Sequence, residues 1–253
     1  MIESYSYRRN DDYLRDVSRG GVVGAQLFGG YGERVTTGAD SGVIWSNGAF
    51  VFPPAAGVQM SIVSTSANDS AAGTGARTIV VSYLDADLIE HSEVVTMNGL
   101  TPVLTVATNI RFIQTMRLAT YGSGKSAAGN ITASNGGNTH SEIYATKFRC
   151  SSSVRMVPAK KRLVVTSLYG GSASGTAAAK TILRLASPSH FDYDFTADSI
   201  FVPLFAATYQ DSSSGLTIPC PISLTEGMSL GMTFETDKAA TIVGSWFGWM
   251  ENI

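Results

Sequence analysis

Residues Ser61–Gly124 read SIVSTSANDS AAGTGARTIV VSYLDADLIE HSEVVTMNGL TPVLTVATNI RFIQTMRLAT YGSG. β-Branched and aromatic residues alternate here with polar ones, and Asn, Asp and Gly separate the alternating segments, which is typical of consecutive antiparallel strands. The predicted strands are Ser61–Thr65, Thr78–Leu84, Ser92–Met97, Val103–Ala107 and Arg111–Leu118. Strands this closely spaced exclude a parallel α/β unit, because parallel strands need helical crossovers. The run therefore predicts a sandwich or a jelly-roll-like pair of sheets.

Asn98-Gly99 stands between two of these segments. Both residues accept the positive φ angles of a type I′ turn. The pair therefore predicts a hairpin that joins Ser92–Met97 to Val103–Ala107. One more short strand is predicted at Asn130–Ala133, within glycine-rich loops.

The rest of the chain continues the β pattern. About eight further segments alternate or are rich in β-branched residues, at the spacing of a complete sandwich. They are Glu142–Cys150, Leu163–Tyr169, Lys180–Ala186, Asp192–Phe195, Ser199–Ala206, Leu216–Cys220, Met228–Glu235 and Ala240–Trp249.

The N-terminal region has a different pattern. Asn10 is a suitable N-cap for a short helix over Asp11–Val17, with acidic residues in its first turn. Beyond it, a high density of glycine between Gly20 and Gly57 disfavours regular helix, and only short apolar islands lie between the glycines. This region predicts an extended, irregular arm, and long ordered loops of this kind suit assembly with other proteins.

These patterns together predict an all-β fold. Two antiparallel β-sandwich or jelly-roll-like units follow an extended N-terminal arm. The predicted boundaries are 1–43 for the arm, 44–137 for the first β-sandwich domain and 138–253 for the second. The alternation does not decide whether the two β units are independent domains or one composite sandwich.

Composition restricts the class of protein. Charged residues make up only 15% of the 253 residues, and Ser, Thr, Gly and Ala take their place. The net charge of −2 and the pI of about 5.9 provide no basic field for nucleic acid. Charged residues near the start of the sequence argue against a signal peptide, and no apolar run is long enough to predict a membrane span. We expect a soluble protein made in the cytoplasm, with Cys150 and Cys220 as free thiols rather than a disulfide.

Several motifs resemble a pattern found in virion structural proteins of tailed bacteriophages, a β-rich family common among marine phages. In the first half the motifs are Ser64-Thr65-Ser66-Ala67-Asn68-Asp69, Gly73-Thr74-Gly75-Ala76-Arg77-Thr78, Leu84-Asp85-Ala86-Asp87, Glu93-Val94-Val95-Thr96-Met97-Asn98-Gly99 and Gly129-Asn130-Ile131-Thr132. Val157–Lys161, Thr166–Leu168 and Pro219–Gly227 resemble the second half of that family more loosely. The resemblance covers most of residues 17–253. It implies a component of the virus particle that is assembled in the host cytoplasm, and it does not say which part of the particle.

One segment resembles a nucleotide-binding loop. Ala119–Ser126 ends in Gly-Lys-Ser, but Ala119 replaces the first glycine of the P-loop motif. The residues that follow cannot begin the long helix whose N-terminus would bind phosphate. We therefore predict a hairpin loop here.

Metal and catalytic sites are not predicted either. The histidines lack the spacing of metal ligands and a partner for catalysis. Asp85/Asp87 and Asp192/Asp194 supply too few oxygen ligands for calcium and are expected to be turn residues. We therefore predict no catalytic, cofactor-binding or metal-binding residues.

Aromatic residues are the candidate interface residues. In a strand, Trp246 and Gly248 would face one way and Phe247 and Trp249 the other. One side would be core, and the other would be either an interface or part of a second core between sheets. The full candidate set is Tyr5, Tyr7, Tyr13, Trp45, Phe50, Phe52, Trp246 and Trp249.

The expected function is that of a non-enzymatic structural protein in a tailed-phage virion. It would act through protein–protein assembly with other virion proteins and as a homo-oligomer, without a cofactor, nucleic acid or membrane. A tail- or neck-associated adaptor or fibre anchor is favoured over a decoration, cement or head-fibre protein on the capsid. A receptor- or glycan-binding module is a further alternative, and a hydrolase acting on the cell envelope is a third hypothesis.

Overall fold

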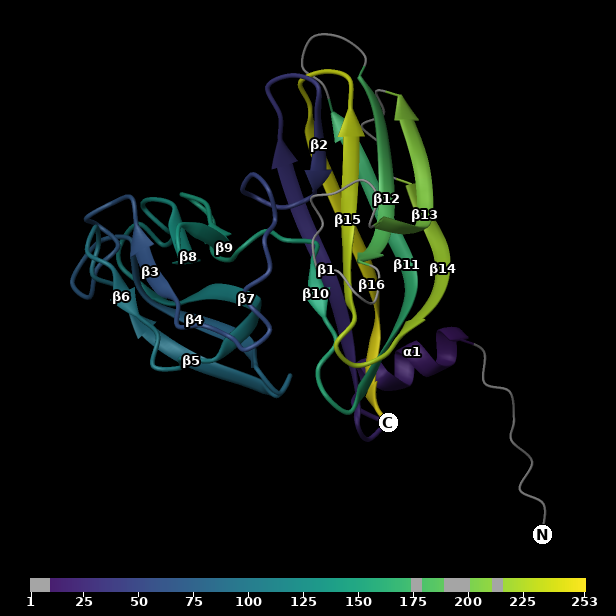
Figure 1. Cartoon of the computed structure of the whole chain (residues 1–253), viewed down its shortest axis with the longest axis horizontal. Helices are drawn as coiled ribbons and strands as arrows, with labels where there is room; N and C mark the ends of the chain where they lie inside the picture. Colours follow the sequence, from purple (N-terminus) through teal and green to yellow (C-terminus); the bar gives the residue numbers. More distant parts are fainter. Residues whose placement is uncertain (1–9, 174–178, 189–200, 211–215) are drawn as a thin grey trace.

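The computed structural model describes residues 10–173, 179–188, 201–210 and 216–253. The described part is nearly all β, with one short helix, α1 (Asn10–Ser18). Its strands are antiparallel and form two units that lie side by side in Figure 1. The prediction of an all-β, antiparallel protein is therefore confirmed.

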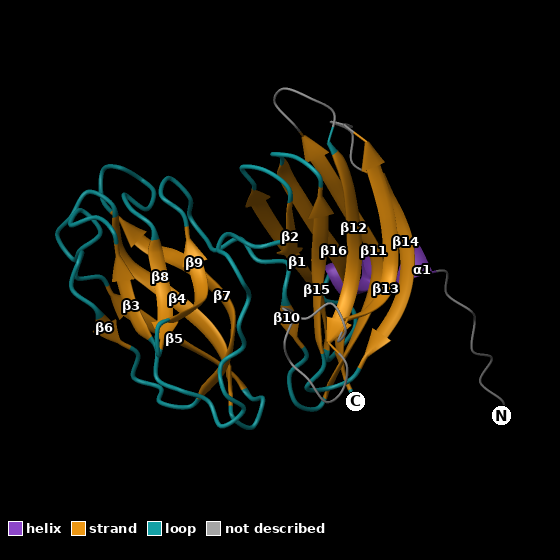
Figure 2. Cartoon of the chain, turned by 45° about the horizontal axis from the view of Figure 1, so that its top comes forward, coloured by secondary structure: helices purple, strands orange, loops and turns teal. Residues whose placement is uncertain are grey.

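The larger unit consists of two facing sheets (Figure 2). One has the strand order β1-β16-β11-β14. The other has the order β10-β15-β12-β13, and β2 also pairs with β15. The bounds are β1 Ala25–Val35, β2 Asp40–Val43, β10 Arg155–Met156, β11 Lys161–Ala173, β12 Lys180–Pro188, β13 Phe201–Gln210, β14 Leu216–Leu224, β15 Ser229–Thr236 and β16 Thr241–Asn252. A core that includes Leu163, Leu185, Phe234 and Trp246 fills the space between the sheets.

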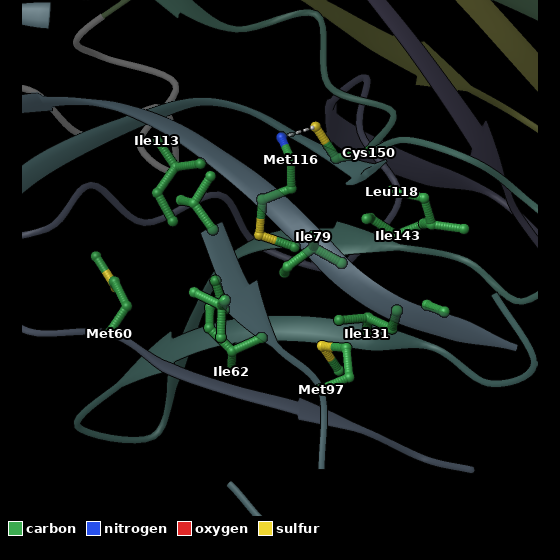
Figure 3. Close-up of a cluster of buried hydrophobic side chains, with 14 of the residues drawn as sticks. Met60, Ile62, Ile79, Met97, Ile113, Met116, Leu118, Ile131, Ile143 and Cys150 are labelled. Atoms are coloured by element: carbon green, nitrogen blue, oxygen red, sulfur yellow. Dashed lines mark hydrogen bonds between the residues drawn. The ribbon is translucent and has the colours of Figure 1, made fainter. Parts of the chain in front are cut away.

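The smaller unit has its own sheets and its own core. One sheet has the order β6-β3-β8-β9 and the other β5-β4-β7. The bounds are β3 Ser61–Ser64, β4 Ala76–Asp85, β5 Glu90–Thr96, β6 Val103–Leu104, β7 Ile110–Tyr121, β8 Ile131–Asn135 and β9 Asn138–Ile143. Figure 3 shows the core, in which Ile62, Ile79, Met116 and Ile131 are fully buried.

The smaller unit is an insertion in the larger one, because the chain leaves the larger unit and returns to it at the same place. Trp45 and Ser152 form an antiparallel bridge, and the Ser46 N–H donates to the Ser151 carbonyl at 3.0 Å. The chain between these two points builds all the strands of the smaller unit.

The irregular arm expected for residues 1–43 is not what the structure contains from residue 10 onward. The eleven residues of β1 pair with β16 along their whole length, from Ala25↔Glu251 to Val35↔Thr241, and β2 pairs with β15. The glycines of β1 are needed because other backbone segments pass close to it. A Cβ at Gly30 would overlap the Ser153 carbonyl oxygen, and one at Gly32 would overlap that of Ile44. Glycine density here marks close backbone approach within a strand.

Three further expectations need correction. Asn98-Gly99 does not form a hairpin, because β5 pairs with β4 whereas β6 pairs with β3 in the other sheet. The strand expected at Glu142–Cys150 is observed as β9, which ends at Ile143. Because β9 pairs with β8, the smaller unit extends beyond the predicted domain boundary at residue 137. The segment Asp192–Phe195 lies outside the described residues.

Most of the other predicted strands are present to within a few residues at each end. The helix predicted over Asp11–Val17 is also confirmed and begins one residue earlier. Cys150 is a free, buried thiol whose Sγ accepts a hydrogen bond from the Met116 N–H at 3.1 Å (Figure 3). The side chain of Cys220 lies outside the described part of the chain.

Candidate interaction surface

The outer face of the sheet β1-β16-β11-β14 carries five exposed apolar side chains, and the register places Glu33 and Ser245 on the same side. Strand register places Leu27, Tyr31 and Val35 on the same side of β1, next to Phe247 of β16 and Tyr169 of β11. These five side chains are 39–60% exposed, although none of them is charged. The outward face of an antiparallel sheet is normally polar when it meets water. Exposed apolar side chains gathered on one sheet face in this way are a common mark of a protein–protein contact.

The alternation of β16 explains why these side chains are exposed. Trp246 points inward and is 2% exposed, and its Nε1–H donates to the Ser153 carbonyl at 2.7 Å. Phe247, its neighbour, then points outward, whereas the sequence pattern predicted only that the two side chains lie on opposite sides. The same alternation in β1 sends Phe28 inward and Leu27 outward. In the sequence, these exposed residues could be recognised because both the inward-facing and the outward-facing positions of β1 and β16 include apolar residues.

Helix α1 covers one end of this face. The rings of Tyr13 and Trp249 lie 5.0 Å apart between their centroids, and the Tyr13 hydroxyl donates to Glu251 at 3.0 Å. Trp249 Nε1–H and the Arg162 guanidinium also donate to Glu251. Burial raises the pKa of Glu251, but the hydrogen bonds from Arg162, Trp249 and Tyr13 outweigh it and hold the pKa below its ordinary value.

Six of the candidate interface residues make contacts inside the chain. Trp45, Phe50 and Phe52 pack with Phe112 where the two units meet, with ring centroids 5.1–5.7 Å apart along the series. Trp246 belongs to the core of the larger unit. Tyr13 and Trp249 form the helix contact, and Tyr5 and Tyr7 lie outside the described residues. None of the five exposed residues of the face, Leu27, Tyr31, Val35, Tyr169 and Phe247, was among the candidates.

The motifs that carry the phage resemblance meet around one buried carboxylate. Asp69 is fully buried, and its Oδ1 accepts hydrogen bonds from the N–H groups of Ala76 at 2.6 Å and Ala128 at 2.8 Å. Its Oδ2 accepts from the Ser64 hydroxyl at 2.6 Å and from the Gly129 N–H at 2.8 Å. Charge-assisted bonds of this kind are among the stronger ones in proteins. Asp69 therefore joins three separate loops at one end of the smaller unit.

A fourth of these motifs contributes its backbone. The Gly99 N–H donates to the Asp69 carbonyl at 2.7 Å, and the Ser64 N–H donates to the Gly99 carbonyl at 3.0 Å. Gly99 has a φ of 63°, which a residue with a Cβ rarely adopts. The quoted motifs thus hold loops in place.

The segment that resembled a P-loop is a connection between sheets. Ser123–Ser126 lies between β7 and β8, which belong to different sheets, so it is not the predicted hairpin loop. The Lys125 N–H donates to the Gly122 carbonyl at 3.1 Å, and Lys125 has a φ of 57°. These features are those of a tight turn, and the next described element is the strand β8.

Asp85 stabilises a turn. Its Oδ1 accepts from the N–H groups of Asp87 at 3.0 Å and Ile89 at 2.9 Å, and its Oδ2 lies 2.9 Å from His91 Nε2. Burial raises the pKa of Asp85, but these hydrogen bonds hold it below its ordinary value. Asp192, Asp194 and His190 lie outside the described residues. Within those residues, no group of three or more His, Cys, Asp and Glu side chains is placed to hold a metal ion.

A shallow hollow of about 290 Å³ lies at the side of the smaller unit, lined by Ser82, Tyr83, Glu90, His91, Ser92 and Gln114. Two of its polar groups connect the units. Glu90 forms an ion pair with Lys161, and Gln114 Nε2–H donates to the Met156 carbonyl at 2.5 Å. No helix in the part of the chain described here is both long and apolar enough to cross a membrane.

Comparison with known proteins identifies no family. No family model matches the chain, and no curated protein matches it. Among solved structures, it is similar to the structure of the Gx strain of infectious bursal disease virus, at 10% identity over 95% of this chain and 78% of that chain, with a TM-score of 0.25. A VP2 subviral particle of the same virus gives 8% identity over 96% and 83%, with a TM-score of 0.19. TM-scores this low indicate neither a shared fold nor a shared function.

Proposed function

We propose that this chain is a non-enzymatic structural component of a tailed-phage particle and that it acts by protein–protein assembly. The larger unit would be the base that docks on the particle, and the inserted unit would project from it. The observation that carries the proposal is the strand order of the larger unit, taken together with the exposed apolar side chains on the outer face of one of its sheets.

The strand order supports a jelly roll. If β1, β2, β11, β12, β13, β14, β15 and β16 are counted as eight successive strands, strands 1, 8, 3 and 6 form one sheet, and strands 2, 7, 4 and 5 form the other. Each connection crosses from one sheet to the other, except the one between β12 and β13, which are neighbours. Two packed sheets of this order are the pattern of a jelly roll, an architecture of viral capsid and lectin domains.

The resemblance to phage virion proteins supports the assignment to a particle. Its most specific motifs converge on Asp69, where they hold the loops of the inserted unit. The residues that carry the resemblance therefore stabilise the fold, as expected for a protein that acts through contacts at its surface.

The exposed apolar side chains of this face supply the driving force for assembly. Burying a large apolar side chain contributes about 1.5–3 kcal/mol, and aromatic pairs contribute somewhat more. Phe247, Tyr31 and Tyr169 stand together on this face, and aromatic residues of this kind are frequent at the centres of interfaces. For the position in the particle, we propose the tail or neck, with the capsid surface as the alternative.

The test is localisation in purified particles of the phage that encodes the chain. Labelled antibody and a cryo-EM reconstruction should place the protein at the tail or neck in a small, symmetric number of copies. Signal over the whole head, in hundreds of copies, would support the capsid alternative. Absence from the particles would overturn the structural role, and turnover of cell-envelope material by the purified chain would favour a hydrolase.

A paired substitution tests the docking face in the same particles. Phe247→Ser removes an aromatic ring from the proposed contact, so we expect fewer copies in the particle. Val94→Ser changes an exposed apolar residue of the inserted unit and should leave the copy number unchanged. Equal incorporation of both variants would contradict docking through this face.

A further inference from the structure

We propose that Arg117 and Arg149 form a binding site for the carboxylate groups of an acidic segment in a partner protein. This inference rests on the assembly role proposed above. It concerns a second surface, which lies on the inserted unit and is separate from the outer face of the sheet β1-β16-β11-β14. The partner is held there by charge-assisted hydrogen bonds.

The two arginines lie directly opposite each other on neighbouring chain segments, where they form an antiparallel bridge. The flanking hydrogen bonds run from the Leu118 N–H to the Phe148 carbonyl at 2.8 Å and from the Cys150 N–H to the Met116 carbonyl at 2.9 Å. The arginine pair itself is therefore a pair without mutual hydrogen bonds, in which the Cα atoms are only about 4.5 Å apart. Both arginines are exposed, whereas Met116, Leu118 and Cys150 beside them are part of the core. The two guanidinium groups thus extend from the same outer face.

Neither arginine has a counter-charge within the described residues. The ion pairs found there do not include Arg117 or Arg149, and neither guanidinium has a hydrogen-bond acceptor there. β7, which carries Arg117, lies on the side of the inserted unit that faces the larger unit (Figure 1). Across that junction Glu33 binds Lys147 at 3.4 Å instead, and Glu90 is likewise in an ion pair of its own. Because like charges directly opposite each other destabilise a sheet, an anion that bridges the two guanidinium groups is favoured.

A third arginine increases the positive charge at this place. The Arg155 guanidinium donates to the carbonyls of Ser152 at 3.0 Å and Val154 at 2.6 Å, and its ion-pair partners among the described carboxylates number none. Burial lowers the pKa of Arg155, and the charge of Arg149 acts in the same direction. A carboxylate bound at Arg149 would relieve this repulsion.

The residues around the arginine pair favour a peptide as the partner. On the neighbouring strand β4, Val80 is the register partner of Arg117. The same face carries the hydroxyl side chains of Thr78, Ser82, Ser92 and Thr115. None of these side chains is an aromatic ring on which a base or a sugar could stack. Hydroxyl groups can instead donate to and accept from the main chain of a peptide, while each guanidinium binds a carboxylate through two parallel N–H groups.

Binding of a fluorescently labelled hexaglutamate peptide to the purified chain tests the site. Fluorescence anisotropy at low ionic strength gives the dissociation constant. We expect Arg117→Gln/Arg149→Gln to weaken binding at least about tenfold. The control Arg19→Gln/Lys125→Gln removes the same charge from two other exposed positions and should weaken binding less than about threefold. Arg117→Lys/Arg149→Lys keeps the charge but loses the paired N–H groups, so we expect it to weaken binding more than the control does.

Three results would overturn the proposal. Equal weakening by the pair variant and by the charge-matched control would show unspecific attraction. Tighter binding of a heparin hexasaccharide than of the peptide at these two arginines would identify a glycan as the partner. A lower denaturant midpoint for Arg117→Gln/Arg149→Gln than for the unmodified chain would assign the arginines to the stability of the fold, whereas removal of a like-charge pair should leave the midpoint equal or higher. Because the titration uses purified chain and peptide, it can fail while the localisation in particles succeeds, and the reverse.

Discussion

At the scale of single residues, Asp69 has the greatest influence on the inserted unit. Asp69→Asn replaces one acceptor oxygen with an NH2 group. When this group takes the Oδ2 position, the Ser64 hydroxyl can accept from it, but the Gly129 N–H loses its acceptor. Buried donors without an acceptor cost about 1–3 kcal/mol each. We expect the free energy of unfolding of this unit to fall by about 1–3 kcal/mol, measured by denaturant titration with circular dichroism.

The matched control for this substitution is Asp87→Asn. Asp87 is an exposed acid in a turn of the same unit, so its neutralisation should change the free energy of unfolding by less than about 0.5 kcal/mol. Hydrogen exchange supplies a local readout, because the amides of Ala76 and Gly129 should exchange faster in the Asp69 variant alone. Unchanged exchange at both amides would contradict the role of Asp69.

His140 makes the fold sensitive to mild acid. It is 7% exposed, its Nδ1–H donates to the Val51 carbonyl at 2.9 Å, and burial lowers its pKa below the ordinary 6.5. As pH falls below about 6.5, the unfolded chain takes up a proton that the folded chain does not. The free energy of unfolding contributed by His140 is therefore present above that pH and is lost as the pH falls towards the folded-state pKa.

The variant His140→Asn separates the pH dependence caused by His140 from that caused by Glu142. His140→Asn keeps a donor for Val51 and cannot take up a proton. We expect the free energy of unfolding to fall less steeply in this variant between about pH 7 and 5.5. Burial raises the pKa of Glu142, so its contribution to stability increases on acidification, but in both proteins alike. If denaturant titrations gave the same pH dependence of the free energy of unfolding in both proteins over this range, the assignment to His140 would be wrong.

At the scale of elements, β1 shows where glycine density misleads. Alternation predicted most of the strands, because one face of each meets a core. In β1 that signal is hidden, since Gly30 and Gly32 occupy inward positions where a Cβ would meet the backbone at Ser153 and Ile44. The contacts that require these glycines come from residues distant in sequence, so no local pattern could reveal them.

The hairpin expected at Asn98-Gly99 failed for a related reason. Its residues do form a turn, in which the Thr101 N–H donates to the Asn98 carbonyl at 3.1 Å. Local turn chemistry was thus read correctly, but which sheet the next strand joins is decided by distant partners, here Ser61 and Ile62. On β16 the predicted interface residues were Trp246 and Trp249, which are buried, and the exposed Phe247 was not among them. Tyr31 and Tyr169 required the register of three strands.

Gly30→Ala tests whether β1 is a paired strand. The added methyl group would lie 2.6 Å from Trp246 Nε1 and would overlap the Ser153 oxygen that this group binds. Overpacking of this kind costs about 1–3 kcal/mol, and the loss should appear in denaturation followed by tryptophan fluorescence. Gly38→Ala is the matched control, because a Cβ there meets nothing within 4 Å. Equal stability of the two variants would support an unpaired arm instead.

At the scale of the whole molecule, the two units differ in what they need from each other. The inserted unit has a closed core of its own, and so has the larger unit. Between them, Trp45, Phe50 and Phe112 form a third apolar cluster, reinforced by the ion pair of Glu90 with Lys161. The units are thus separate in folding architecture but fixed to one another, which suits a base that must hold a projection at a defined angle.

Excision of the insertion should leave the larger unit folded. Ser46 and Ser151 are hydrogen-bonded neighbours, so a two- or three-residue glycine link from Asn47 to Cys150 can replace residues 48–149 without moving either strand. Both sheets and the core between them remain, and we expect cooperative unfolding. Trp45 loses Phe50 and Phe112 and becomes exposed, so its fluorescence should shift to the red, and Trp45→Ser in the excised chain should abolish that shift. A chain without cooperative unfolding would show instead that the larger unit depends on its insertion, because the apolar cluster at the junction would then be part of one shared core.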